Sequence, residues 1–379
     1  MKLARFVCAF LLLLVFASLC KTFIGWSEDR GIYDDICYLR QAHLFERFGW
    51  KGFDTDIALE TDNYLAQKLK NIGYPEWDDR KNAPCHNFIP QTGKTVMQYP
   101  MGPGLLLAIF PSGFQVAPLY IACTAILLIV ALASVYLATT PAALFFATLF
   151  GGISIYLMNN PVKSSYSLAP TMVVCALTAL LTSALFDIKR PLPRYLTVAA
   201  IGLLLGLGVN LRIANLVLAA GFGCWLLLVF LRRPNLSKFL EGAIFGAAFA
   251  IGVLPTLWAN HINTGSALIS PYDVPRPRFS IDQTIEQLHL YLGGTQGVLL
   301  VVATLAVISL LIFARGKLLQ VTAIAALTLL VNIVYFFAYP IFTPYYLVPT
   351  AMLSLWLMLW GYLLHSGTAM KADVAYAHA

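Results

Sequence analysis

The chain alternates between long apolar runs and short polar connections. The runs are about 20 residues long and do not alternate with period two, so they predict membrane-spanning α-helices instead of barrel strands. Ten spans are expected, at residues 4–24, 115–138, 141–158, 169–187, 195–210, 213–231, 239–258, 297–314, 318–338 and 347–365. This pattern predicts an all-α polytopic membrane protein.

The basic residues follow these spans in a regular way. If the N-terminus is cytoplasmic, the short connections on the cytoplasmic side contain Lys189, Arg190, Arg194, Arg232, Arg233, Lys238, Arg315 and Lys317. Short cytoplasmic loops carry an excess of Lys and Arg. The even number of spans and this distribution together predict that both termini are cytoplasmic.

Two longer polar stretches then lie on the opposite side, at residues 25–103 and 259–296. Within the first stretch, apolar residues recur at helical spacing over 33–48, which predicts an amphipathic helix lying on the membrane surface. A weaker helical pattern covers 62–69. Because no repeat or separate soluble domain is visible, we expect residues 1–379 to form a single transmembrane domain with an elaborated outer face.

The composition agrees with a membrane protein. Of 379 residues, 59% are hydrophobic and 11% are charged, whereas about 25% are charged in typical soluble domains. The net charge of +7 is spread over the connections, which argues against a nucleic-acid-binding face. Five of the seven cysteines lie in apolar runs. Cys37 and Cys85 share the first polar stretch, where an oxidising compartment would allow them to pair and a reducing one would leave two free thiols.

Asp34 and Asp35 open the predicted helix at 33–48. Carboxylates near a helix N-terminus interact favourably with the helix dipole, which is one explanation for the pair. The other explanation is that one carboxylate acts as a general base and removes a proton from an attacking hydroxyl group. The residues alone leave both explanations open.

Arg212 is the second candidate. It stands between two apolar spans, near the outer leaflet in the predicted topology, with Asn210 and Asn215 beside it. Ionisable residues at this depth usually face a cavity or a partner, and a guanidinium group suits bidentate contact with phosphate. A lipid phosphate is therefore the expected ligand, and snorkelling of the side chain to the interface is the alternative.

Other polar residues reach the same side in less specific settings. The Pro and Gly residues of the stretch QYPMGPGLLLAIFP interrupt helical structure. Such backbone either lines a cavity or forms a plain joint between a loop and a span. Further candidate ligand contacts are Tyr99, Lys163, Arg276, Arg278, Tyr345 and Tyr346. Walker A, dinucleotide-binding, zinc-ligand and nucleophile-elbow patterns are absent from the sequence. We therefore expect no cofactor, and a synthetic reaction would need an activated substrate.

Several stretches, taken in order, resemble polyprenyl-phosphate-dependent membrane glycosyltransferases of the GT-C superfamily, in the bacterial branch of protein mannosyltransferases and aminoarabinose transferases. They are YDDICYLRQA, YPMGPGLLLA, GLLLGLGVNLR, LPTLWANHINTGSALISPY and FTPYYLVPTAML, and they follow nearly the whole chain. The resemblance implies a GT-C-like bundle in a bacterial inner membrane, with its two long polar stretches in the periplasm. It also implies a sugar donor linked to polyprenyl phosphate and a cell-envelope glycan, lipid or protein as acceptor.

The resemblance further implies roles for individual residues. In that superfamily an Asp at the start of the first outer loop is the catalytic base, which matches Asp34, with Asp35 as the second acid and Tyr38 as the following aromatic residue. Outer-facing basic residues bind the lipid phosphate, and the candidates here are Arg212, then Arg276, Arg278 and Lys163. One departure concerns the last outer segment, where relatives commonly have an Arg and this chain has Pro344, Tyr345 and Tyr346.

Two other functions compete with the expected inverting sugar transfer. A lipid-linked saccharide flippase or other transporter typically has related halves and polar residues near the membrane midplane, whereas polar residues here gather at one face. A glycan polymerase or ligase works at that face but needs two lipid-linked substrates. No metal cluster is expected, although a single divalent cation between Asp34 or Asp35 and the phosphate stays open.

Overall fold

The computed structural model describes residues 1–30, 33–80, 83–157, 159–162, 164–272, 280–339, 342–343 and 345–377. Within these residues, nine helical segments are long and apolar enough to cross a membrane. They comprise α1 (Lys2–Ile24), α5 (Val116–Leu137), α7 (Leu168–Leu185), α8 (Pro191–Leu211), α9 (Leu218–Arg232) with the preceding turn η5 (Ile213–Val217), α10 (Leu236–Thr264), α12 (Thr295–Phe313), α13 (Gly316–Phe337) and α14 (Val348–Ala377). The predicted multi-pass helical membrane protein is confirmed.

Each predicted span coincides with one of these apolar segments or with α6 (Pro141–Tyr156), which is apolar but has only 16 residues. The largest boundary differences are in two helices. α10 continues past the predicted end at 258 to Thr264, and α14 continues past 365 to Ala377. α10 therefore extends into the stretch that the sequence pattern assigned to an outer loop.

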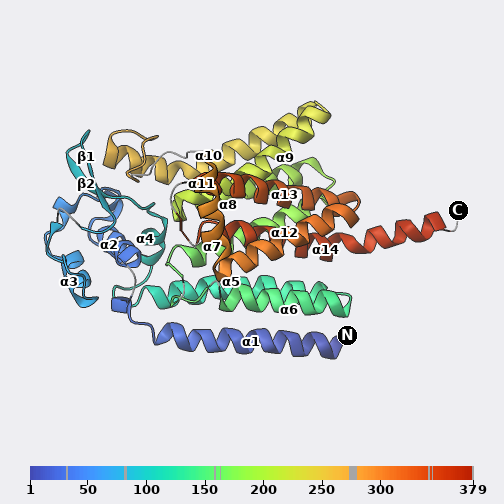
Figure 1. Cartoon of the computed structure of the whole chain (residues 1–379), viewed down its shortest axis with the longest axis horizontal. Helices are drawn as coiled ribbons and strands as arrows, with labels where there is room; N and C mark the ends of the chain where they lie inside the picture. Colours follow the sequence, from blue (N-terminus) through green and yellow to red (C-terminus); the bar gives the residue numbers. More distant parts are fainter. Residues whose placement is uncertain are drawn as a thin grey trace.

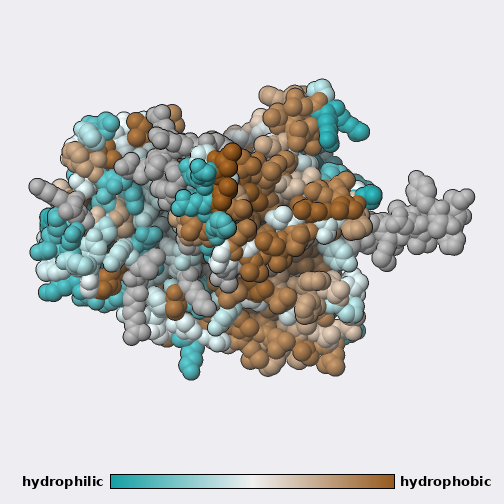
Figure 2. Space-filling model, viewed as in Figure 1, coloured by the Kyte–Doolittle hydropathy of each residue, from teal (hydrophilic) through white to brown (hydrophobic). Residues whose placement is uncertain are grey.

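The helices pack into one bundle in which α8 and α10 make the most extensive contact. Gly206 allows this close approach, because a Cβ atom there would collide with the carbonyl oxygen of Phe249. Figure 2 shows an apolar surface over the bundle and a mostly hydrophilic surface at one end. This distribution fits a bundle surrounded by lipid, with the larger hydrophilic end outside the bilayer.

A layer that we call the cap, formed by described residues between 28 and 107, covers one end of the bundle (Figure 1). It contains α2 (Tyr33–Phe48), α3 (Tyr64–Asn71), α4 (Gly102–Leu107), β1 (His86–Ile89), β2 (Lys94–Met97) and the short turns η1 (Glu28–Arg30), η2 (Gly49–Phe53) and η3 (Ile57–Leu59). Both chain termini lie at the opposite end of the bundle. α11 (Ile281–Leu292) directly precedes α12.

Two features of the cap differ from the sequence-based expectation. The predicted helix at 33–48 exists, but it does not leave its polar side open, because the polar residues Arg40 and Gln41 are buried in protein as fully as Ile36 and Leu39. The polar side of α2 packs against other parts of the cap instead of facing water. The antiparallel hairpin, with His86 opposite Met97 and Ile89 opposite Lys94, was not predicted.

Candidate functional site

α2 presents Asp34 and Tyr38 to a pocket at the junction of the cap and the bundle. The two residues are four positions apart and therefore share one helix face. Asp34 lies in the first turn of α2, while Tyr38 is 4% exposed. The orientation of α2 thus decides where the Asp34 carboxylate lies.

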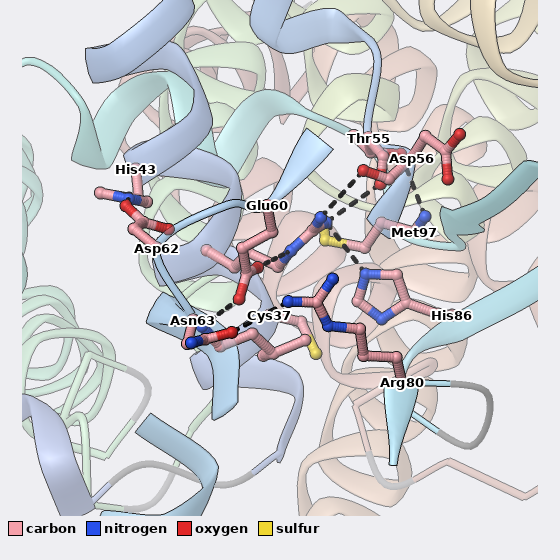
Figure 3. A network of polar contacts seen from close by, with 12 residues as sticks. Cys37, His43, Thr55, Asp56, Glu60, Asp62, Asn63, Arg80, His86 and Met97 are labelled. Atoms are coloured by element: carbon pink, nitrogen blue, oxygen red, sulfur yellow. Dashed lines mark hydrogen bonds and ion pairs between the residues drawn. The ribbon is translucent and has the colours of Figure 1, made fainter. Parts of the chain in front are cut away.

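Arg40 fixes that orientation from inside the cap. Its side chain is fully buried, and its Nε donates to Glu60 Oε2 at 2.7 Å. The guanidinium also donates to the Thr55 carbonyl oxygen at 3.0 Å and the Asp56 carbonyl oxygen at 3.2 Å. Figure 3 shows Glu60, Thr55, Asp56 and His86 gathered in this part of the cap. Because a buried charge without partners is costly, these bonds hold α2 in one position.

His86 completes the shell around Arg40. Its Nδ1 lies 2.7 Å from the Pro84 carbonyl oxygen and its Nε2 lies 3.0 Å from Arg40 Nη1, so a neutral ring can donate through Nδ1 and accept through Nε2. Burial and the Arg40 charge lower the pKa of His86 to about 3. The ring is therefore neutral in the folded protein at neutral pH.

A disulfide bond joins Cys37 to Cys85, so the alternative of two free thiols does not hold. Cys37 lies on α2, one turn after Asp34, and Cys85 directly precedes β1. The bond ties α2 to the hairpin across 48 residues of sequence. It supports the placement of α2 that the Arg40 contacts establish.

Arg212 lies at the break between α8 and η5, and an asparagine on each side secures this break. Asn210 donates to the Gly252 carbonyl oxygen at 2.6 Å and accepts from the Thr256 amide at 2.9 Å, which joins the end of α8 to α10. Asn215 donates to the Gly208 carbonyl oxygen at 2.8 Å. Arg212 itself has extended backbone, with φ −152° and ψ 127°.

Asp34 and Arg212 line the same pocket, which has a volume of about 300 Å³. The remaining lining residues are mostly hydroxyl-bearing: Tyr38, Tyr99, Pro100, Ser165, Ser167, Ile213, Ala214, Tyr272, Thr343, Tyr345 and Tyr346. Small-molecule sites in proteins begin at about this volume. We call this space the junction pocket.

The tyrosines of the junction pocket contact one another and both charged groups. The Tyr99 hydroxyl donates to Asp34 Oδ1 at 2.6 Å, and its ring lies 5.4 Å from that of Tyr38. On the other side the Tyr99 ring lies 5.9 Å from that of Tyr272. The Arg212 guanidinium carbon lies 5.6 Å from the centre of the Tyr345 ring. Tyrosine side chains therefore contact both the carboxylate and the guanidinium.

Burial keeps these tyrosines uncharged. It raises the pKa of Tyr38 far above the ordinary value, while Arg212 lowers and Asp34 raises that same pKa, so Tyr38 senses both charges. Burial and then the Asp34 carboxylate also raise the pKa of Tyr99. Each phenol consequently remains a neutral hydrogen-bonding group at physiological pH.

Arg212 lacks a complete set of partners. Among the described residues, its Nη1 is buried and has no hydrogen-bond partner. A buried guanidinium nitrogen without an acceptor is energetically unfavourable. An anion in the junction pocket would supply that acceptor, so the geometry disfavours the alternative of a side chain that merely snorkels.

A second, smaller cavity of about 140 Å³ adjoins the junction pocket, and the two share Ile213, Ala214, Tyr272 and Tyr346. Its other lining residues are largely apolar or aromatic: Leu216, Val217, Ser270, Tyr335, Phe336 and Tyr339. Leu216 is 50% exposed and Tyr335 is 38% exposed on the bundle surface. The smaller cavity therefore lies beside the junction pocket and is bordered by apolar and aromatic residues that are partly exposed on the bundle.

The structure brings six of the predicted site residues together in the junction pocket: Asp34, Tyr38, Tyr99, Arg212, Tyr345 and Tyr346. Asp35 does not line it; this residue is 2% exposed and accepts a hydrogen bond from the Tyr166 backbone amide. Lys163, Arg276 and Arg278 lie outside the described residues.

Sequence reasoning missed Ser165, Ser167, Tyr272 and Thr343 as pocket residues. The serines belong to the stretch NNPVKSSYS, whose density of polar residues between two apolar spans was the available signal. Tyr272 follows Pro271 at the end of LPTLWANHINTGSALISPY, and its place in that family-like stretch was the only signal for it.

Within the described ranges, no group of three or more His, Cys, Asp or Glu side chains is arranged to hold a metal ion. No family model matches the chain, and no match was found among curated proteins or solved structures. The function of this protein is therefore inferred from the geometry of the junction pocket.

Proposed function

We propose that this protein is an integral membrane glycosyltransferase of the GT-C type that moves a monosaccharide from a polyprenyl-phosphate donor to an acceptor hydroxyl group on the cap side of the membrane. One observation carries the proposal. A carboxylate and a guanidinium line one hydroxyl-rich pocket, and one buried nitrogen of that guanidinium has no hydrogen-bond partner among the residues that the structure describes. The adjoining apolar cavity fits a donor whose phosphate carries a lipid chain.

In the proposed reaction Asp34 is the general base. Its Oδ1 accepts the Tyr99 hydrogen bond, and its second oxygen takes the proton from the acceptor hydroxyl. The acceptor oxygen forms a bond to the anomeric carbon while the bond from that carbon to the phosphate oxygen breaks. Attack on the face opposite the phosphate inverts the configuration. Asp34 then loses its proton to solvent.

Arg212 binds the phosphate in this scheme. The leaving polyprenyl phosphate gains negative charge as the bond breaks, and a fixed cation beside it stabilises the transition state. The neutral phenols and serines surround the sugar. Such groups recognise hydroxyls without adding a competing charge. The proposed site is on the periplasmic side of a bacterial inner membrane.

Purified protein in proteoliposomes, supplied with a panel of radiolabelled polyprenyl-phosphate sugars, tests the proposal through sugar release and transfer. Removing the base in Asp34→Asn should lower kcat by about 10²- to 10⁴-fold. Arg212→Gln should raise the donor KM, and Arg212→Lys should restore part of the affinity. Asp29→Asn is the control, because Asp29 lies in η1, outside the pocket lining.

The same proteoliposomes separate the competing functions. A flippase would carry labelled lipid across the bilayer without releasing sugar, and a polymerase or ligase would consume two lipid-linked saccharides. Full activity in Asp34→Asn would rule out Asp34 as the base.

A further inference from the structure

Asp35 is adjacent to the proposed base but makes different contacts. It is 2% exposed, and its Oδ1 accepts a hydrogen bond from the Tyr166 backbone amide at 3.0 Å. Tyr166 belongs to the connection between α6 and α7, 131 residues away in sequence. Asp35 therefore joins the first turn of α2 to a distant irregular segment.

That segment is anchored at several other points. The Tyr166 side chain is fully buried, and its hydroxyl accepts a hydrogen bond from Trp26 Nε1 at 3.0 Å. The Asn159 side chain donates to Thr124, and Ser164 Oγ donates to the Asn160 carbonyl oxygen at 2.9 Å. The Tyr120 hydroxyl lies 3.4 Å from the carbonyl oxygens of Ser164 and Ser165, to which it donates. Asp35 holds the backbone amide of the residue between Ser165 and Ser167.

These two serines line the junction pocket on either side of Tyr166 in sequence. Their hydroxyl oxygens lie 3.3 Å apart, and Ser167 is hydrogen-bonded to Tyr38. Ser165 is 3% exposed and Ser167 is 1% exposed. A shift of the Tyr166 backbone would carry both hydroxyls with it, because they are its immediate neighbours.

We propose that Asp35 is a positioning residue, whose carboxylate holds the Tyr166 amide and thereby sets Ser165 and Ser167 as the wall that binds hydroxyl groups of the donor sugar. This inference rests on the proposed glycosyltransferase function. The role requires an acceptor oxygen at the position of Oδ1 and does not require a negative charge. The two adjacent acids therefore have separate tasks, since Asp34 must carry charge to accept a proton.

Substitutions of Asp35 distinguish an acceptor oxygen from a charge. Asp35→Asn keeps an oxygen that can accept from the Tyr166 amide, so the donor KM and kcat should stay within about threefold of wild type. Asp35→Leu has similar size but no acceptor and should raise the donor KM about tenfold, with a smaller change in kcat. Asp34→Asn should show the reverse, a loss of kcat.

The serine wall is tested in the same assay. The double variant Ser165→Ala/Ser167→Ala should raise the donor KM to a similar extent. Adding Asp35→Leu to it should have little further effect, because all three substitutions act on one interaction. Ser154→Ala is the matched control, since Ser154 is a buried serine outside the pocket lining that bonds to its own helix.

Hydrogen exchange of the Tyr166 amide gives a readout independent of catalysis. Exchange should be faster in Asp35→Leu and unchanged in Asp35→Asn and in the serine variant. If wild-type protein transfers no sugar from any donor, the proposed function fails, while the exchange result still decides the anchoring role. If Asp35→Asn loses kcat while the Tyr166 amide stays protected from exchange, the charge of Asp35 and not its acceptor oxygen is needed for the reaction. An unchanged donor KM in the serine variant would show that Ser165 and Ser167 do not bind the donor.

Discussion

At the scale of single residues, the polar side chains that form the site are those whose hydrogen bonds lipid cannot supply. Asp34, Arg212 and all the pocket tyrosines except Tyr272 could be identified from the sequence because polar groups are scarce beside apolar spans. Ser165, Ser167 and Tyr272 were missed, since serines and a tyrosine in a polar connection look like ordinary loop residues. The division of labour between Asp34 and Asp35 was equally hidden, because it depends on the Tyr166 amide, 131 residues from Asp35.

His86 makes a pH-dependent contribution to stability. Its pKa is lowered from 6.5 to about 3 in the folded protein, so the unfolded chain binds a proton below pH 6.5 that the folded protein does not. The contribution is fully present above pH 6.5 and is lost as the pH falls toward 3. Between pH 7.5 and 5, wild-type stability should fall by about 1 to 2 kcal/mol from this group.

Thermal unfolding in detergent at the two pH values measures this effect. In His86→Gln, which keeps an acceptor for Arg40 but does not titrate, the pH dependence should become smaller. An equal pH dependence in both proteins would mean that His86 is not the group responsible.

At the scale of elements, the spans could be predicted and the placement of the cap helices could not. A long apolar run that crosses a bilayer satisfies its backbone hydrogen bonds by forming a helix. For α2, the sequence pattern of 33–48 predicts the apolar stripe correctly. It does not predict which residues cover the polar side of the helix. That cover comes from Glu60, Thr55 and His86, which lie in three other parts of the cap.

Gly102 at the start of α4 lies tightly against the end of α8 in the bundle. A Cβ atom there would collide with the backbone carbonyl oxygen of Asn210, two residues before Arg212. Gly102→Ala should therefore displace α4 from the end of α8, lower stability by about 1 to 3 kcal/mol and reduce sugar transfer. Thermal unfolding and the transfer assay measure the two effects.

Gly246→Ala provides the comparison, because a Cβ atom on that α10 residue would meet nothing within 4 Å. Alanine is also the better helix former, so this variant should be at least as stable as wild type. Equal behaviour of the two variants would show that the approach at Gly102 is not tight.

At the scale of the whole molecule, function depends on which side of the membrane the cap faces. Both termini lie at the end of the bundle opposite the cap (Figure 1). The basic connections 185–191, 232–236 and 313–316 lie at the same end as the termini, because successive spans alternate in direction. The positive-inside rule and the disulfide in the cap both favour a cap outside the cytoplasm.

Reporter fusions in a bacterial host test this orientation. Alkaline phosphatase fused after Ser112, between α4 and α5, should be active, whereas the same enzyme fused after Arg190 should be inactive. Green fluorescent protein at the C-terminus should fluoresce. The opposite pattern would place the junction pocket on the cytoplasmic side. A soluble sugar donor would then replace the lipid-linked donor in the proposed reaction.

The bond between Asn263 and the Thr55 amide spans 208 residues of sequence, and this has a consequence for biosynthesis. The N-terminal part of the cap leaves the ribosome long before the end of α10 exists. At translation rates of about 5 to 20 residues per second, the delay is about 10 to 40 s. During that interval the polar surface around Thr55 has no partner from α10. The nascent chain therefore presents an incomplete domain to quality-control proteases and chaperones, and maturation of this protein ends only when its second half has been inserted.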